Sequence, residues 1–296
     1  MTSAAFAVVL LTGGTVACGG GAESDSANED PPKVTPAAAV AEAAKKSEDI
    51  ASLHYRITGT MPEKGRMEAE ASMSTEPLAM SMKMTAVDQG RDGRLEIRFV
   101  DEVMYVGGSA VASKKLDGRS WFRADPAVWG RGVADNNSYG VLPRQIEGSP
   151  AVQSTILTGS KDLRKIGTER IDGTRTTHYR GTVTGSGLSA ARDAAADKAT
   201  RERQIESLDQ FYALGVDDTL TMDLWIDDDD RAKQFRMRGK TDDMRDGTDG
   251  EPLDLTITFL GVNEPVTVET PSAGDTVDLG ALADDAQEGG ATPGEE

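Results

Sequence analysis

Two histidines and a single cysteine are the residues of this 296-residue chain best suited to acid–base, nucleophilic or zinc chemistry. His178 lies within an alternating polar run, with Thr176, Arg180 and Thr182 on its side, and His54 lies on the polar side of another run. A catalytic histidine needs an orienting acid and a nucleophile or substrate proton within reach, and the sequence contains no evident triad or zinc set. We therefore expect His178 to be structural or to face solvent, and the protein not to be an enzyme.

Other chemically suggestive motifs have simpler interpretations. The carboxylates of Asp227–Asp230 suit calcium, but their contiguous spacing lacks the alternating ligands of a calcium loop and favours a charged hairpin turn. Gly185–Gly187 lacks the lysine of a phosphate-binding loop and is expected to be a loop before a helix. Trp121, Trp129 and Trp225 are expected in the core or at its rim, not in a sugar platform. We expect no metal and no cofactor.

Cys18, the only cysteine, cannot form an internal disulfide and follows an uncharged N-terminal segment. The apolar run at residues 6–11 is shorter than the ~20 residues needed to span a bilayer, which is typical of a signal peptide at residues 1–17. Small residues directly before Cys18 resemble the lipobox of bacterial lipoproteins, in which the cysteine is diacylated and becomes the new N-terminus. An incidental buried thiol is the alternative. We expect an acyl anchor at Cys18 on the extracytoplasmic face of the cell membrane.

Composition divides the remaining chain into three parts. Residues 18–34, rich in Gly, Ser, Asp and Glu, are expected to be a flexible tether, and residues 280–296 a disordered acidic tail. Residues 35–279 are long enough for one domain with a large core. The net charge of −18 means that the average surface would repel phosphate backbones and anionic lipid headgroups. Nucleic-acid binding is therefore not expected, and the acidity is interpreted as a means of solubility.

The domain is expected to begin with a helix and continue mainly as strands. Thr35 is a suitable N-cap, Pro36 suits the first helical position, and residues 37–50 carry Val40, Ala43, Ser47 and Ile50 on one face. Period-two alternation marks strands at residues 53–57, 67–73, 80–84, 95–99, 103–106, 120–123, 163–170, 175–184, 220–226, 235–237 and 253–259.

Turn residues and two further helices complete the expected architecture. Hairpin turns are expected at Glu76-Pro77, Asp117-Gly118 and Asp172-Gly173. A short helix is expected at residues 150–157 and a long one at 188–214, the latter with Ile205, Leu208, Phe211 and Tyr212 on one side. The sequence thus predicts an α+β fold, a curved antiparallel sheet of about ten strands wrapped over a few helices.

Several segments resemble, in order, actinobacterial lipoproteins of the LppX/LprG/LprF group. They are SLHYRITG, KLDGRSWFRAD, IGTERIDGTRTTHYRGTV, MDLWIDDDDRAKQFRM and ITFLGVNEPVTVETP, within residues 36–271, and DGTRTTHYRGTV and LWIDDDDR are the most specific pieces. The resemblance implies a LolA/LolB-like half-barrel with a hydrophobic cavity between sheet and helices. It further implies binding of the acyl chains of lipids or glycolipids and their movement from the membrane towards the outer envelope.

Methionines provide a separate indication of an apolar binding surface. Met67, Met73, Met80, Met82 and Met84 alternate on two adjacent strands, and methionine adapts to variable apolar partners. From the residues alone, they either fill a closed core or line a lipid-contacting surface, and the resemblance favours the second.

The candidate cavity residues follow from this hypothesis. They are Leu53, Tyr55, Ile57, Met67, Met73, Met80, Met82, Met84, Leu95 and Ile97. We expect a membrane-tethered, monomeric lipid carrier or chaperone of the cell envelope. The alternative is a closed-core interaction or sensor module with a protein partner, and an enzyme is a third possibility.

Overall fold

The computed structural model describes residues 34–62, 65–86, 93–109, 111, 116, 118–124, 154–216, 219–241 and 250–280. The predicted signal peptide, Cys18 with nearly all of the predicted tether, the predicted acidic tail after residue 280, and Trp129 lie outside these residues. Within the described part of the chain, no helix is long and apolar enough to cross a membrane.

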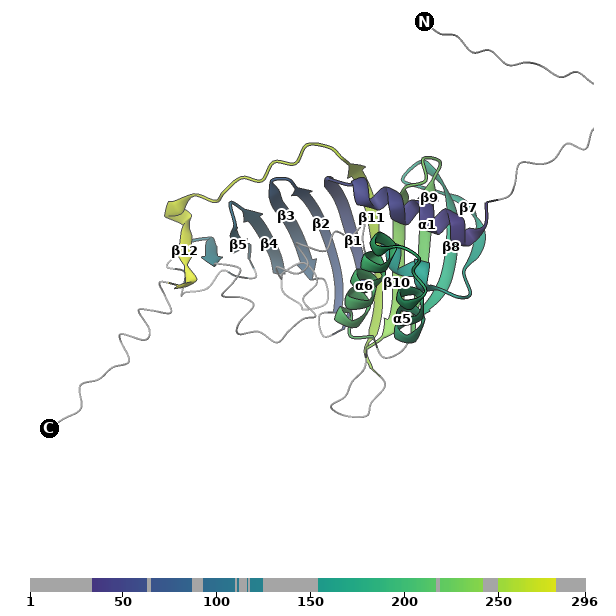
Figure 1. The fold of residues 1–296 in the computed structure, drawn as a ribbon. Helices are drawn as coiled ribbons and strands as arrows, with labels where there is room; N and C mark the ends of the chain where they lie inside the picture. The colour runs from purple at the N-terminus through teal and green to yellow at the C-terminus, as the bar shows by residue number, and fades with distance from the viewer. Residues whose placement is uncertain are drawn as a thin grey trace, which may run out of the picture. The chain divides into compact units, whose positions relative to one another are not determined.

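One sheet of 12 strands dominates the fold, in the order β12-β6-β5-β4-β3-β2-β1-β11-β10-β9-β8-β7 (Figure 1). Its strands are β1 (Ser52–Met61), β2 (Gly65–Thr75), β3 (Leu78–Ala86), β4 (Gly93–Val100), β5 (Val103–Gly107), β6 (Trp121–Ala124), β7 (Arg164–Ile171), β8 (Thr174–Thr184), β9 (Thr219–Asp227), β10 (Ala232–Lys240), β11 (Pro252–Val262) and β12 (Thr276–Asp278). Near the middle of the sheet, β1 pairs with β11, the last long strand, and all pairs are antiparallel except β12 with β6. The predicted α+β class with a curved, open sheet agrees with this architecture.

The expected number of about ten strands was too low. β12 has three residues, Thr276–Asp278, which is too short to show a period in the sequence. Side-chain contacts hold it beside β6: the Ser120 amide donates to Asp275 Oδ1 at 2.8 Å, and Arg123 pairs with Asp278 at 2.8 Å. Such contacts join residues about 150 positions apart, so local pattern cannot predict this strand.

Hairpin turns lie where turn residues predicted them. Asp172 and Gly173 have φ of 47° and 81°, so the β7–β8 turn needs two positive φ values, which the Asp-Gly pair tolerates. Glu76-Pro77 joins β2 to β3, and Asp227–Asp230 joins β9 to β10 with Asp230 at φ 59°. Gly118, at φ 79°, lies between β5 and β6, which pair, while Asp117 is outside the described residues.

The N-terminal helix begins as predicted. α1 spans Pro36–Lys46, with Pro36 in the first turn, and Thr35 Oγ1 accepts from the Ala38 amide at 3.2 Å. The predicted apolar face is buried at Val40 and Ala43. A 3-10 turn, η1 (Ser47–Asp49), continues α1 towards β1.

The predicted long helix is two helices, which corrects the sequence interpretation. α5 spans Gly185–Asp193 and α6 spans Lys198–Ala213. Thr184 caps α5 by accepting from the Gly187 amide at 3.0 Å, so Gly185–Gly187 is its first turn and not a loop. Asp197 caps α6 through the Thr200 amide at 2.8 Å, which lets a new helix start in a different direction.

The buried face of α6 also differs from the expectation. Leu208 and Phe211 are buried, but Ile205 is 42% and Tyr212 63% exposed. Gln204 and Ser207 are buried instead, because the neighbouring 3-10 helix η3 (Ser154–Gly159) supplies hydroxyl partners. Ser207 Oγ lies 2.9 Å from Thr155 Oγ1, and Gln204 Nε2 donates to Thr158 Oγ1 at 2.8 Å.

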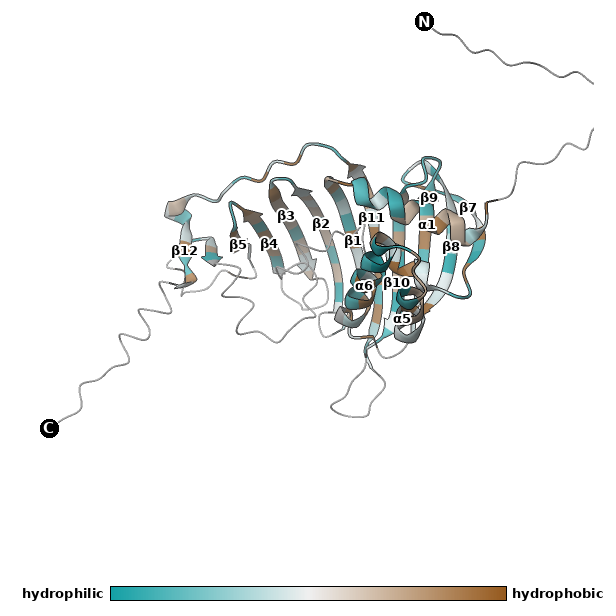
Figure 2. Ribbon diagram, in the orientation of Figure 1, coloured by the Kyte–Doolittle hydropathy of each residue, from teal (hydrophilic) through white to brown (hydrophobic). Residues whose placement is uncertain are grey.

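η3 connects the helices to the sheet. It contacts α1, α5 and α6 on one side and β8 and β9 on the other. Gly181 of β8 allows this approach, because a Cβ there would lie 2.2 Å from Ser160 Oγ. Figure 2 shows the alternation of apolar and polar residues along the strands. We call the side of the sheet that packs towards η3 the inner face and the opposite side the outer face.

Candidate functional site

The inner face is apolar across the centre of the sheet. Leu53, Tyr55 and Ile57 of β1 are at most 4% exposed and belong to one hydrophobic cluster with the helices. In register on β2 they meet Met73, Ala71 and Ala69. Each strand contributes alternate residues to this cluster, so the predicted period two is the reason that these side chains converge.

The predicted methionine row lies on this inner face. Met73 pairs with Met80, Ala71 with Met82 and Ala69 with Met84, across β2 and β3. On the next strand, β4, Phe99, Ile97 and Leu95 continue the same three rows. Every predicted cavity residue is in the hydrophobic cluster or packs against it; only Met84 and Leu95 are partly exposed. The structure thus brings the ten together, while a role in ligand binding stays a prediction.

Small and flexible side chains alternate along this surface. Ala69 and Ala71 are short and lie beside the long side chains of Met82 and Met84, which have three rotatable bonds each. Burial raises the pKa of the Tyr55 phenol, so this hydroxyl stays neutral at physiological pH. A surface of this composition offers apolar contact and no nucleophile or acid–base pair, so it suits binding through burial and not catalysis.

Sequence reasoning left out the second half of the apolar face. Met222 and Met237, on β9 and β10, are fully buried and pair with each other across the strands. The sequence pattern that could have identified Met222 and Met237 is the same alternation that identified the methionines of β2 and β3. It is present in the runs at 220–226 and 235–237. This half packs on η3 and α6 through residues such as Leu157 and Phe211.

A charged cluster on the outer face surrounds the predicted structural histidine. His178 is 7% exposed, and its Nε2 lies 2.6 Å from Asp223 Oδ1, while Nδ1 lies 3.2 Å from Glu169 Oε1. The ring stacks on Trp225 with centroids 4.3 Å apart, and Trp225 Nε1 donates to Glu169 at 2.6 Å. His178 is therefore buried and does not face solvent, and a carboxylate lies at each of its ring nitrogens. Asp223 was missed, although an aspartate within an apolar strand run is an unusual feature.

Asp223 is the centre of this cluster. It is 1% exposed and accepts hydrogen bonds at 2.6 Å from Arg180 Nε and from Arg238 Nη2. Burial by itself raises the pKa of this carboxyl, but the hydrogen bonds from His178, Arg180 and Arg238 outweigh it and lower the pKa. Among the contacts of the described residues, no hydroxyl or thiol lies on the His178 ring nitrogens, so the cluster lacks a nucleophile.

The remaining motifs have structural roles in the described residues. Asp227 Oδ1 accepts from the amides of Asp229 at 3.0 Å and Arg231 at 2.8 Å, so this carboxylate closes the predicted charged turn. His54 Nδ1 lies 2.7 Å from Ser72 Oγ on the outer face. Trp121 is partly buried beneath the Arg98 guanidinium, 4.7 Å from its ring centroid.

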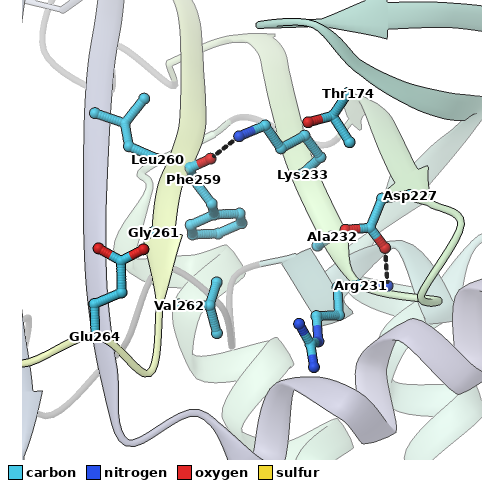
Figure 3. Close-up of a pocket in the computed structure, with 10 residues that line it drawn as sticks. All are labelled: Thr174, Asp227, Arg231, Ala232, Lys233, Phe259, Leu260, Gly261, Val262 and Glu264. Carbon is cyan, nitrogen blue, oxygen red and sulfur yellow. Dashed lines mark hydrogen bonds between the residues drawn. The ribbon is translucent and has the colours of Figure 1, made fainter.

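A pocket of about 240 Å³ opens where β10 and β11 diverge (Figure 3). Their pairing starts only at Gln234 and Thr258, and Leu260 is skipped in the pairing of β11 with β1. Lys233 Nζ donates a hydrogen bond to the Phe259 carbonyl at 2.5 Å. This bond takes the place of a backbone hydrogen bond between the two strands at this point. The lining residues are Thr174, Asp227, Arg231, Ala232, Lys233, Phe259, Leu260, Gly261, Val262 and Glu264.

The chemistry of this pocket is mainly polar. Figure 3 shows the Phe259 ring and Val262 pointing into it, with Arg231, Lys233 and Asp227 around the opening. Two cationic and two anionic side chains share its rim, and no nucleophile is paired with a base there. The pocket therefore suits a small polar group and differs from the apolar surface expected for acyl chains.

The fold and the apolar face together define an α+β protein built on an open, largely antiparallel sheet, with helices and an adaptable apolar surface on one side. No family model matches the sequence. An uncharacterized 31.2 kDa protein from Streptomyces griseus is 30% identical over 209 residues, which are 69% of this chain. The chain spans 62% of the length of that relative.

Solved structures similar to this chain include two mycobacterial lipoproteins. LppX from Mycobacterium tuberculosis has a TM-score of 0.45 and 16% identity, covering 79% of this chain and 98% of LppX. LprF from Mycobacterium bovis has a TM-score of 0.47 and 13% identity, covering 80% of this chain and 97% of LprF. Both belong to the group that the sequence segments resemble.

Proposed function

We propose that this protein is an exported lipoprotein, anchored through Cys18, that binds acyl chains of lipids or glycolipids on its inner sheet face. In this role it serves as a non-enzymatic carrier or chaperone of the cell envelope. The observation that carries the proposal is the methionine and alanine surface of β2 and β3, continuous with Leu53, Tyr55 and Ile57 of β1.

The energetics of such binding require little directional chemistry. Burial of apolar surface contributes about 25 cal/mol per Å², or about 0.8 kcal/mol for each methylene. An acyl chain beside Met80, Met82 and Met84 gains this energy in many arrangements, because methionine side chains adjust to the shape of the guest. A carrier of acyl chains that differ in length would need such tolerance.

One observation favours a second candidate, a closed-core interaction or sensor module. Met82 and Ile97 are 1% and 0% exposed, which is the burial expected of a filled core. In that case the inner face only stabilises the fold, and function depends on a protein partner at the surface.

Ala71→Met separates the two candidates. Ala71 is 5% exposed and lies between Tyr55 and Met82, so a longer side chain there enters the space of a guest. For a carrier, we expect unchanged stability and roughly tenfold weaker lipid binding, the effect of losing space for about two methylenes. For a filled core, overpacking lowers the free energy of unfolding by about 1–3 kcal/mol.

The control is Glu70→Met, which adds the same side chain to the same strand on the exposed outer face. Bound lipid is measured by native mass spectrometry of gently purified protein, and stability by urea unfolding. Empty wild-type protein together with a destabilised Ala71→Met variant would overturn the carrier proposal.

A further inference from the structure

A group of arginines lies on the outer face, on the side of the sheet opposite the apolar surface. Arg164 of β7 pairs in register with Arg180 of β8, and Arg180 pairs with Asp223 of β9. Like charges directly opposite each other on neighbouring strands destabilise a sheet. The Arg164–Arg180 pair is therefore a local cost that a bound anion between the two side chains would remove.

Asp223 holds two of the guanidinium groups in position. Arg180 uses only Nε, and Arg238 uses only Nη2, each at 2.6 Å from a different oxygen of Asp223. The two arginine side chains are 35% and 34% exposed, so part of each side chain is open to solvent. Arg238 Nε is buried and has no hydrogen-bond partner among the described residues.

The nearby carboxylates also hold other groups. Asp162 Oδ2 lies 3.8 Å from Arg164 Nη1, but Asp162 Oδ1 already accepts from Ser160 Oγ at 2.9 Å and from the Thr182 amide at 2.6 Å. The pKa of Asp162 is lowered, mainly by the Thr182 hydrogen bond, so this carboxyl is ionised. The three arginines thus share two carboxylates, Asp162 and Asp223, that other groups also occupy. Asp254 lies opposite Arg238 in the strand register but is engaged by Arg236, and Glu169 is engaged by His178 and Trp225.

We propose that Arg164, Arg180 and Arg238 form a binding site for a phosphate-type oxyanion, which we call the arginine site. Planar guanidinium groups match the geometry of phosphate oxygens and can donate to them in pairs. The net charge of the chain does not prevent binding, because charges beyond about 8 Å are screened at physiological ionic strength. The phosphate belongs either to a lipid headgroup at the membrane or to a free oxyanion.

The test uses the full chain carrying Cys18→Ser, so that acylation does not contribute to membrane binding. Free phosphate is titrated against chloride at matched ionic strength, with thermal stability and isothermal calorimetry as readouts. In parallel, flotation is measured with vesicles of phosphatidic acid in phosphatidylcholine and with phosphatidylcholine alone. We expect binding that weakens roughly tenfold in Arg164→Gln, the effect of losing one charge-assisted donor group.

Arg164→Gln is the deciding variant, because this side chain is 57% exposed and does not hold Asp223, so the fold should be retained. The matched control is Arg175→Gln, which removes a 64% exposed arginine of β8 that faces Asp228 at 3.9 Å. Binding of phosphate alone identifies a free oxyanion, and binding of phosphatidic acid vesicles identifies a headgroup. The proposal is overturned if neither binds, or if Arg175→Gln weakens binding as much as Arg164→Gln.

Because the arginine site and the apolar surface lie on opposite faces, their tests are independent. Loss of acyl-chain binding in Ala71→Met says nothing about phosphate, and Arg164→Gln leaves the inner face unchanged.

Discussion

At the residue scale, one buried carboxylate connects three neighbouring strands. Asp223 receives hydrogen bonds from His178, Arg180 and Arg238, which come from the strands on both sides of β9. A buried ion group of this kind need not stabilise a fold beyond what apolar residues would, but removing one member leaves charges unpaired. The cluster thereby links β8, β9 and β10 through side chains.

Asp223→Asn tests this role. We expect the free energy of unfolding at pH 7 to fall by about 3 kcal/mol, because asparagine loses the charge and turns an NH2 donor towards His178 or an arginine, which are donors or cations themselves. The pKa of Asp223 is lowered below 3.8 in the folded state, so its contribution is present above that value and lost as pH falls through the folded pKa. The difference between wild type and variant, measured by urea unfolding, should therefore shrink at strongly acidic pH.

Asp254→Asn is the comparison, since Asp254 is 39% exposed and pairs with Arg236 at 2.6 Å. An exposed pair contributes about 1 kcal/mol at most. Equal losses in the two variants would show that burial of Asp223 has no special effect on stability.

At the element scale, the sheet depends on close contact at its centre. Gly59 in β1 has φ of 143°, and a Cβ there would lie 2.0 Å from the Asp254 carbonyl oxygen. β1 is the first strand along the chain and β11 the last long one, and their pairing joins the two halves of the sheet. No side chain fits at this position without moving one strand away from the other.

Gly59→Ala should lower the free energy of unfolding by about 3 kcal/mol, through backbone strain and separation of β1 from β11. Gly167→Ala in β7 is the control, because no atom lies within 4 Å of its added Cβ and its φ is ordinary. Thermal unfolding of both variants measures the effect, and a Gly59→Ala variant as stable as Gly167→Ala contradicts the expected strain.

At the scale of the whole molecule, the proposed carrier role requires that the domain stay close to the membrane. Cys18 would provide this through acylation, and it lies outside the described residues. Two acyl chains hold a protein at a bilayer far more firmly than one, since each buried methylene contributes about 0.8 kcal/mol.

Cys18→Ser should abolish acylation and move the protein from the membrane fraction to the soluble or secreted fraction. Cell fractionation and incorporation of an alkyne-labelled palmitate measure these outcomes. Circular dichroism should show an unchanged fold, because Cys18 precedes the domain that begins at α1 (Pro36–Lys46). Membrane retention of the variant at wild-type levels would rule out the anchor.

Local pattern in the sequence determined most elements of this fold. Alternation identified the long strands, and Thr35, Pro36 and the Asp172-Gly173 pair marked a helix start and a hairpin. These features depend on neighbouring residues alone, through side-chain direction, capping and positive φ. The methionine row on the inner face could be predicted for the same reason.

Only the tertiary structure decided which strands far apart in the sequence pair and which polar groups meet. The pairing of β1 with β11, the addition of β12 and the buried polar face of α6 all depend on partners distant in the chain. His178 and Asp223 are 45 residues apart, and nothing local indicates that their strands are adjacent. Whether a polar residue in an apolar run joins a charge cluster or is left without a partner depends on its neighbours across the strands. The register of the sheet determines which residues those neighbours are.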